Sequence, residues 1–402
     1  MQNQSIESIP HGWVPEAHRL WLSNNRNEAI QAVIAYINSV IPEFPQRPAT
    51  QFAYYLFMLG EWSAASAIFS RIVANYPQDR EALLNLGICQ NRAGDYASAL
   101  KSLENYLQLV PDDYAAWDAM TAVCYHLQLL DQAREAGSRS LALKDHKHSH
   151  LPAKWSPPRG KPSKLAQKPG KYNVISYSLW GNNPRYLRGA LRNALFASEI
   201  YPGWRCQFHV DASVPAELVD ALHELGAETI MHPDEEANIR QRLARRFWVA
   251  NDPKVGYFLV RDCDSVIGPR EAQAVQTWIQ SERWFHVMRD WWTHTDLVLA
   301  GMWGGVAGVL PDLRRLFEDY QSPHAETPNW DQWFLRDRVW AYMRKSCLAH
   351  DRCFSSKDAT PFPGPLPEGS YHVGQDEYAV NAEMQAKILE SWITKLACLR
   401  QT

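Results

Sequence analysis

Two aspartates separated by one residue, Asp262 and Asp264, closely follow a strongly apolar run at 255–260. Side chains two residues apart on an extended chain leave the same side, so both carboxylates can approach one cation. Their hard oxygens suit Mn²⁺ or Mg²⁺, and such a metal neutralises a diphosphate so that it can depart as a leaving group. The spacing therefore predicts a divalent metal site at the end of a strand.

The segments before these aspartates alternate between strand and helix patterns. Strands are expected at 172–178, 206–210, 228–231 and 255–260, and helices at 184–200, 216–225 and 238–250. Such alternation predicts an α/β unit with a mostly parallel sheet covered on both faces. Ligands of these sheets bind beyond the carboxyl ends of strands, which is where the two aspartates are expected.

A repeat occupies the first third of the chain. Gly60, Trp62, Ala65, Phe69 and Pro77 recur 34 residues later as Gly94, Tyr96, Ala99, Leu103 and Pro111. The order of glycine, aromatic, small, bulky and proline residues fits paired antiparallel helices, and it resembles the tetratricopeptide repeat.

Weaker copies of the repeat give about four helical pairs over residues 11–146. The resemblance implies an all-α solenoid that binds a protein, although a purely stabilising cap is the alternative. Polar and aromatic residues that a binding groove could use are Tyr54, Tyr55, Asn85, Asn91 and Tyr125.

A linker is expected at 147–170, where prolines alternate with lysines and arginines and the helical periodicity stops. This composition predicts a basic, extended connector.

The second domain, assigned to 171–402, resembles glycosyltransferases of the GT-A fold, a Rossmann-like fold with an Asp-x-Asp motif after its nucleotide-binding half. The resemblance implies a metal-dependent hexosyltransferase that uses a nucleotide diphosphate sugar, with a UDP-sugar favoured. The repeats would recruit its protein or glycan acceptor.

The resemblance also implies roles for individual residues. The nucleotide sugar would contact the end of the first strand, two arginines, the first aspartate and a glycine-rich loop, which gives Ser176, Tyr177, Ser178, Leu179, Arg246, Arg261, Asp262, Gly301, Trp303 and Gly304. His372 would join Asp262 and Asp264 as a metal ligand. Asp331 is the expected catalytic base, and Asp290 is its rival.

Two other interpretations remain. An Asp-x-Asp pair also resembles the first motif of haloacid-dehalogenase-like phosphatases, but that motif usually lies on the first strand of its domain. Alternatively, the chain is a tetratricopeptide interaction protein whose transferase domain is catalytically degenerate.

The composition bounds the partners and the location. A formal net charge of −3 provides no broad basic surface for nucleic acid. The amino terminus lacks the pattern of a secretory signal, and no apolar stretch is long enough to span a bilayer. A cytoplasmic protein is therefore expected, with peripheral membrane contact left open.

Overall fold

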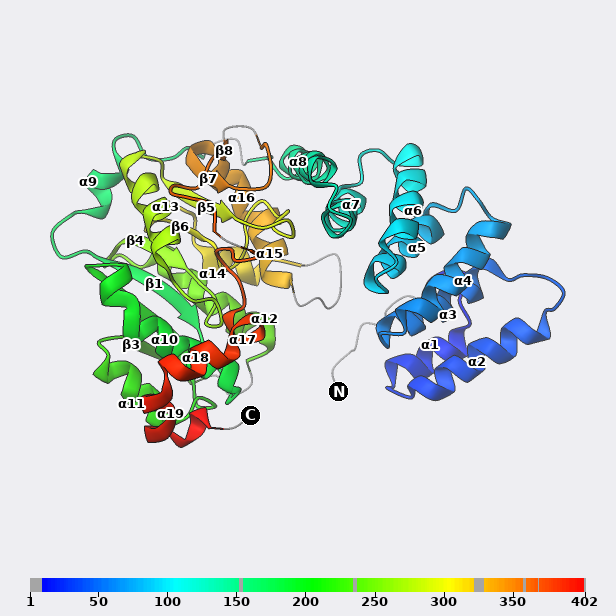
Figure 1. Cartoon of the computed structure of the whole chain (residues 1–402), viewed down its shortest axis with the longest axis horizontal. Coiled ribbons are helices and arrows are strands. Elements are labelled where there is room, and N and C mark those ends of the chain that lie inside the picture. The colour runs from blue at the N-terminus through cyan, green and yellow to red at the C-terminus, as the bar shows by residue number, and fades with distance from the viewer. Residues whose placement is uncertain are drawn as a thin grey trace. The chain divides into compact units, whose positions relative to one another are not determined.

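The computed structural model describes residues 9–151, 155–233, 237–321, 329–356, 359–367 and 369–400. The chain divides into two compact units, residues 1–143 and 144–402 (Figure 1). The first is an all-helical repeat unit and the second is a mixed α/β unit, as the sequence predicts. Residues 152–154 of the expected linker lie outside the described part of the chain.

Consecutive helical pairs build the repeat unit. Its described residues form α1 (Pro15–Leu22), α2 (Arg26–Ser39), α3 (Gln46–Met58), α4 (Trp62–Asn75), α5 (Arg80–Arg92), α6 (Tyr96–Leu109), α7 (Tyr114–His126) and the start of α8 (Leu130–Lys147). Small residues allow the helices to cross closely. At Gly87 of α5, an added Cβ would lie 2.8 Å from Leu103 Cδ2 of α6.

Each helical pair turns through a residue with left-handed backbone. These residues are Asn24, Gly60, Gly94 and Gln128, with φ of 62°, 81°, 82° and 60°. In every case the next amide donates to the carbonyl five residues earlier, at 2.8 to 2.9 Å, which closes the end of the preceding helix. The two glycines of the sequence repeat are therefore required by the backbone, and Gln128 occupies a position that favours glycine.

Tyr55 is not available to a binding groove, contrary to the expectation from sequence. Its side chain is fully buried, and its ring stacks on Trp21 with centroids 4.1 Å apart. The Gln51 amide donates to its hydroxyl at 2.8 Å. The neighbouring Tyr54 is 39% exposed.

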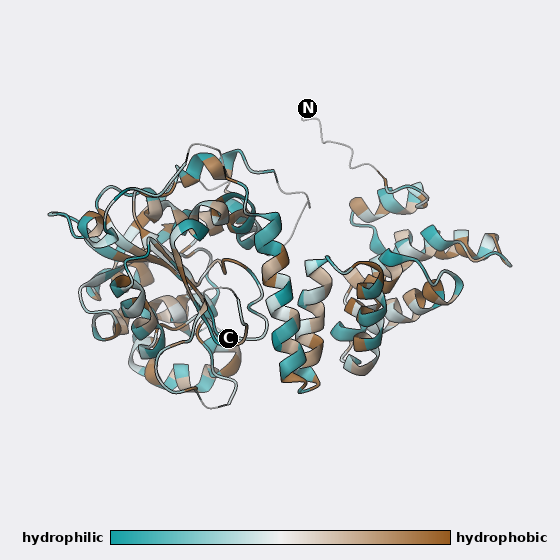
Figure 2. Ribbon diagram, turned by 90° about the horizontal axis from the view of Figure 1, so that it is seen from above, coloured by the Kyte–Doolittle hydropathy of each residue, from teal (hydrophilic) through white to brown (hydrophobic). Residues whose placement is uncertain are grey.

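An eight-stranded mixed sheet in the order β3-β2-β1-β4-β6-β5-β7-β8 forms the centre of the second unit. The strands are β1 (Tyr172–Ser178), β2 (Trp204–Asp211), β3 (Glu228–His232), β4 (Val255–Val260), β5 (Phe285–Arg289), β6 (Trp303–Val306), β7 (Cys347–Asp351) and β8 (Ala359–Thr360). Only β6 among them runs antiparallel to its neighbours, β4 and β5. The central strands are coloured hydrophobic in Figure 2, and every residue of β4 is buried.

The helical segments of this unit are α9 (Pro162–Ala166), α10 (Pro184–Ile200), α11 (Ala216–Glu224), α12 (Ile239–Ala244), η1 (Arg245–Asn251), α13 (Pro269–Gln280), α14 (Leu313–Glu318), α15 (Trp330–Phe334), η2 (Leu335–Val339), α16 (Trp340–Met343), η3 (Arg344–Ser346), α17 (Glu377–Val380), α18 (Ala382–Ile388), α19 (Glu390–Lys395) and η4 (Ala397–Leu399). The helix expected at 238–250 is thus divided into α12 and the 3₁₀ turn η1. The segment expected to be an extended linker contains α9, whose last carbonyl would lie 2.3 Å from a Cβ added at Gly256 of β4.

The glycine-rich segment expected as a tight loop is a turn up to Met302 and then continues as the strand β6. A Cβ added at Gly304 would lie 2.5 Å from Phe258 O, and one at Gly305 would lie 2.8 Å from Phe285 Cδ1. Glycine is therefore needed so that β6 can fit between β4 and β5. Trp303 is fully buried beside Phe258 and does not face a sugar pocket.

No helix among the described residues has both the length and the apolar character needed to cross a membrane.

Replacing Gln128 by glycine should stabilise the last helical pair of the repeat unit. A left-handed residue with a Cβ costs roughly 1–2 kcal/mol relative to glycine, so we expect a gain of about 1 kcal/mol. Amide hydrogen exchange of α7 in the full chain measures this change. The reciprocal control, Gly94→Gln, should weaken protection in α5 and α6, and equal protection in Gln128→Gly and the wild type would contradict the explanation.

Buried histidines should make the second unit less stable in acid. Burial lowers the pKa of His209 to about 3 and that of His350 to about 4, from an ordinary 6.5. Between about pH 6.5 and 4 the unfolded chain takes up protons that the folded chain does not, so the free energy of unfolding falls as pH falls. Urea unfolding followed by tryptophan fluorescence across this range should show that slope. His350→Gln should reduce the slope by about one proton, and an unchanged slope would refute the assignment.

Candidate functional site

The sheet reverses its direction of growth between β1 and β4. From β1 the chain builds β2 and then β3 on one side, whereas β4 and all later strands lie on the other side. Because β1 and β4 are parallel, their carboxyl ends meet at the same edge of the sheet. Such a switch point is where open α/β sheets usually bind ligands.

A cavity of about 460 Å³ opens at this switch point. The segments that follow β1 and β4, the first turn of α10, the α12–η1 segment and a late loop all contribute to it. The residues that line it are Ser178, Leu179, Trp180, Arg185, Tyr186, Ile239, Leu243, Arg246, Asp262, Cys263, Asp264, Gly374 and Asp376. The structure thus brings together five of the residues expected from sequence, namely Ser178, Leu179, Arg246, Asp262 and Asp264.

Helix α10 holds the turn that carries the two aspartates. A Cβ added at Gly189 would lie 1.9 Å from the Cys263 carbonyl oxygen, so only glycine allows this contact. The buried Asn193 side chain donates to the carbonyls of Cys263 and Ser265, at 3.3 and 3.0 Å, and accepts from the Ile267 amide at 3.0 Å. The turn is therefore positioned from behind by one amide side chain.

Asp262 forms an ion pair with the buried guanidinium of Arg246. On its other side, Arg246 donates to Asp331 at 2.8 Å. Burial opposes the charged form of Arg246, but the two carboxylates outweigh it and raise the pKa of the guanidinium. Gly301, expected near the donor, lies against Asp262, because a Cβ there would be 1.9 Å from Asp262 Oδ2.

Asp264 pairs with Arg185, whose Nε lies 3.0 Å from Asp264 Oδ2. The same guanidinium reaches Asp376 Oδ2 at 2.6 Å. Burial raises the pKa of Asp264, the charges of Asp262 and Asp376 raise it further, and Arg185 opposes them. The three carboxylates thus lie close enough to influence one another, and Arg185 neutralises part of their charge.

Neither expected catalytic base lines the cavity. Asp331, at the start of α15, is buried, and its carboxylate accepts from Arg246 and from the Gln332 amide. Burial raises its pKa, which Arg246 counteracts. Its position is that of a residue that orients Arg246.

Asp290 is also fully engaged. Its carboxylate accepts from Arg270 at 3.1 and 3.3 Å and from the Val373 amide at 2.9 Å. It therefore anchors the loop before Gly374, and it presents no open side to an acceptor hydroxyl.

Strand alternation turns two expected donor-binding residues away from the cavity. Tyr177 is fully buried against Phe208, on the opposite face of β1 from Ser178. Arg261 is buried and donates to Glu271 at 3.1 Å, away from Asp262. Ser176 is fully buried below Ser178 and does not line the cavity.

His372 is not brought to the aspartates. Its ring stacks on Trp291 with centroids 4.5 Å apart, and its Nδ1 donates to the Ser370 carbonyl at 2.9 Å. The cavity is reached instead by Gly374 and Asp376 of the same loop. No group of three or more His, Cys, Asp or Glu side chains within the described segments is arranged as a metal site.

Sequence reasoning missed Arg185, Asp376 and Asn193. Arg185 lies in the first turn of the helix after the first strand, and Asp376 accepts from the amides of Tyr378 and Ala379 at the start of α17. The positions of Arg185 and Asp376 at helix starts could have been recognised in the sequence. That both residues meet at Asp264 depends on the fold.

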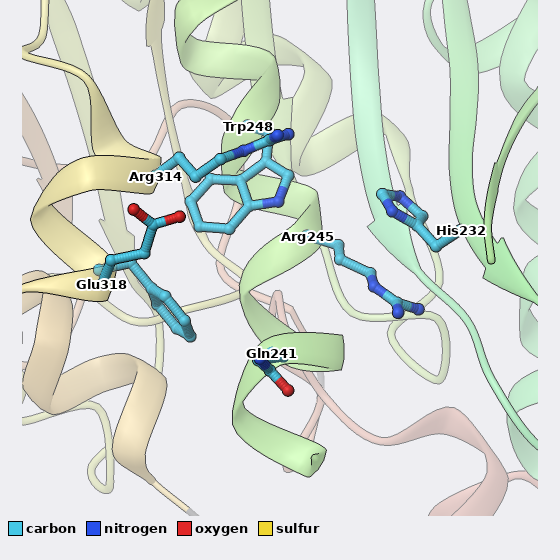
Figure 3. Close-up of a pocket in the computed structure, with 7 residues that line it drawn as sticks. His232, Gln241, Arg245, Trp248, Arg314 and Glu318 are labelled. Carbon is cyan, nitrogen blue, oxygen red and sulfur yellow. The ribbon is translucent and has the colours of Figure 1, made fainter. Parts of the chain in front are cut away.

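A second cavity of about 220 Å³ lies on the other side of α12–η1 (Figure 3). It is lined by His232, Gln241, Arg245, Trp248, Arg314, Phe317 and Glu318. Residues 239, 243 and 246 face the first cavity, and residues 241, 245 and 248 face the second. A third cavity, of about 560 Å³, lies beside β2, β3 and η1. Asp262 and Asp264 line neither of these two cavities, so the switch-point cavity, which they do line, is the candidate active site.

Comparisons with known proteins bear on the repeat unit. The tetratricopeptide repeat family model matches residues 50–114, so the chain contains this repeat, which indicates a role in protein interaction. No curated protein matches the chain.

Solved structures of MamA are similar to the helical part of the chain. MamA from Desulfovibrio magneticus RS-1 is 21% identical, covering 34% of this chain and 78% of that chain with a TM-score of 0.31. Another crystal structure of MamA is 17% identical, covering 33% and 77% with a TM-score of 0.31.

Asp331→Asn should destabilise the second unit. The change breaks one buried ion pair of Arg246, which Asp262 still neutralises, so we expect a loss of about 2 kcal/mol in the free energy of unfolding. Urea unfolding by tryptophan fluorescence measures it, with the exposed Asp220→Asn as control. Unchanged stability in Asp331→Asn would argue against the orienting role.

Proposed function

We propose that the second unit is a metal-dependent glycosyltransferase domain of the GT-A type that uses a nucleotide diphosphate sugar, and that the repeats recruit its protein or glycan acceptor. One observation carries this proposal. The Asp262 and Asp264 segment lines a cavity at the switch point together with the residues that follow β1. The reaction class expected is hexosyl transfer, with a UDP-sugar as the favoured donor.

The walls of the cavity suit a nucleotide. Leu179, Trp180 and Tyr186 supply apolar and aromatic surface for a base, and Arg185 and Arg246 supply positive charge for phosphates. The cavity is therefore apolar toward the end of β1 and charged toward the end of β4.

The donor set suits Mn²⁺ or Mg²⁺. Asp262 and Asp264 offer hard oxygen ligands, and both already attract cationic partners in the form of arginines. These two residues would hold the metal, while phosphate oxygens and water complete its coordination. A bound metal would neutralise the departing diphosphate.

Catalysis in this proposal depends on positioning and charge. Asp331 fixes Arg246, and Arg246 in turn fixes Asp262. Asn193 and Gly189 fix the turn from the side of α10. The acceptor hydroxyl would enter the cavity from solvent.

The second candidate is an interaction protein with a catalytically degenerate transferase domain. The match of the repeats to a protein-interaction family favours it, and so does the pairing of both aspartates with arginines. A phosphatase is less favoured, because Asp262 follows the fourth strand of the unit and its carboxylate is bound to Arg246.

Calorimetry separates these candidates. The wild-type chain should bind UDP, or another nucleotide diphosphate, only with Mn²⁺, and a chelator should abolish binding. Replacing Asp262 and Asp264 together by asparagine should weaken UDP binding more than about 100-fold, since changes beside metal ligands alone cost 10–100-fold. Hydrolysis and transfer of the donor sugar should be lost in parallel.

The exposed Asp220→Asn is the control, because it makes the same kind of substitution outside the cavity. A wild-type chain that binds no nucleotide diphosphate with Mn²⁺ would reject the enzyme and leave the interaction protein. Binding and turnover that survive in the double variant would reject the two aspartates as the site.

A further inference from the structure

Arg185 joins two segments of the cavity that are far apart in sequence. It lies in the first turn of the 17-residue helix α10, where Asn183 accepts from its amide. Its guanidinium contacts Asp264, which follows β4, and Asp376, which precedes α17. A single cationic group thus occupies the space between two carboxylates.

The two arginines of the cavity differ in their freedom to move. The side chain of Arg246 is 3% exposed and is held between Asp262 and Asp331. That of Arg185 is 41% exposed and rests beside the Tyr186 ring, 5.2 Å from its centroid. Arg185 can therefore change partners by rotating its side chain, whereas Arg246 cannot do so without breaking a buried network.

A divalent metal and Arg185 compete for the same oxygens. The Arg185 guanidinium already contacts Oδ2 of Asp264 through Nε and Nη2. A metal bound to that carboxylate would place two cations in contact, and their repulsion in a partly buried site is strong. Metal binding through Oδ2 of Asp264 therefore requires that Arg185 move.

The charge of the cavity indicates where Arg185 then goes. The carboxylates of Asp262, Asp264 and Asp376 with the guanidiniums of Arg185 and Arg246 sum to one negative charge, and Asp331, which pairs with Arg246 from outside the cavity, makes it two. A divalent metal cancels this charge and takes the Asp264 carboxylate from Arg185, and a diphosphate then offers the freed guanidinium a new anionic partner. The displaced guanidinium, at the amino-terminal end of a long helix, lies on the wall where an anion is favoured.

We propose that Arg185 is an exchangeable counter-ion, which the divalent metal displaces from Asp264 and which then binds the diphosphate of the donor. Metal and nucleotide therefore bind cooperatively, because the metal removes the negative charge that would repel the diphosphate and frees Arg185 to bind it. This inference rests on the proposed function and assigns Arg185 as its diphosphate-binding residue.

Calorimetry on the full chain tests the exchange with Mn²⁺ alone and with UDP at saturating Mn²⁺. In Arg185→Gln the competitor is absent, so Mn²⁺ alone should bind about 10-fold more tightly than to the wild type. The same variant should bind UDP about 10-fold more weakly, because a charge-assisted contact to the diphosphate is lost.

Two further variants make the result specific. Arg185→Lys keeps the positive charge, so its affinity for Mn²⁺ should stay near that of the wild type and its loss of UDP affinity should be smaller. Arg205→Gln removes the same charge at the exposed start of β2 and should change neither affinity. Arg205 lies at the amino-terminal ends of the parallel strands, opposite the carboxyl ends where the cavity opens. Circular dichroism checks that each variant is folded.

Opposite changes in the two affinities support the exchange. Weaker binding of both Mn²⁺ and UDP in Arg185→Gln, or no change in either affinity, would overturn the exchange. The proposed function would still hold in that case if the wild-type chain binds UDP with Mn²⁺. A wild-type chain that binds Mn²⁺ but no UDP would reject the proposed function and the diphosphate role together.

Discussion

The parallel pairing of β1 with β4 is the contact on which the arrangement of the second unit depends. It places the end of an apolar strand, with two aspartates just beyond it, next to the end of the first strand of the sheet. The reversal of strand order at this pair leaves space between the loops, and that space is the cavity. Helices on both faces then fix the aspartates, with Asn193 on one side and the Arg246 network on the other.

The strands and helices of this unit were largely predictable from sequence, because burial of one face makes apolar residues recur with a period characteristic of each. Strands at 172–178 and 255–260 were found with almost the expected bounds. In the glycine-rich stretch at 301–305, residues 303–305 were misassigned to a loop, since glycines at a close sheet contact and glycines in a loop look alike without the neighbouring strands. Successive side chains of β1 point to opposite faces of the sheet. Ser178 and its neighbour Tyr177 therefore cannot both face the cavity, and the sequence alone allowed Tyr177 to be excluded as a donor-binding residue.

The candidate site was predictable only in part, for a physical reason. Asp262 and Asp264 are close in sequence and carry their own signal, whereas Arg185, Asn193 and Asp376 reach them from remote segments. Asp331 and Asp290 were predicted as catalytic bases, but neither lines the cavity, because each forms a buried ion pair that no local pattern reveals. In the repeats, by contrast, the left-handed turn recurs every 34 residues, at Gly60, Gly94 and Gln128, and so the sequence repeat and the backbone repeat coincide.

The α12–η1 segment lies between two cavities, and neighbouring residues of this segment line different cavities. Arg245 faces one cavity and Arg246 faces the other. Which arginine reaches which cavity therefore depends on its position around the helix axis, and not only on the amino-acid composition of the segment. One inserted residue would turn everything after it by about 100° and move Arg246 away from Asp262. This stretch should therefore accept substitutions more readily than changes in length, unlike the surface loops that connect most elements of such folds.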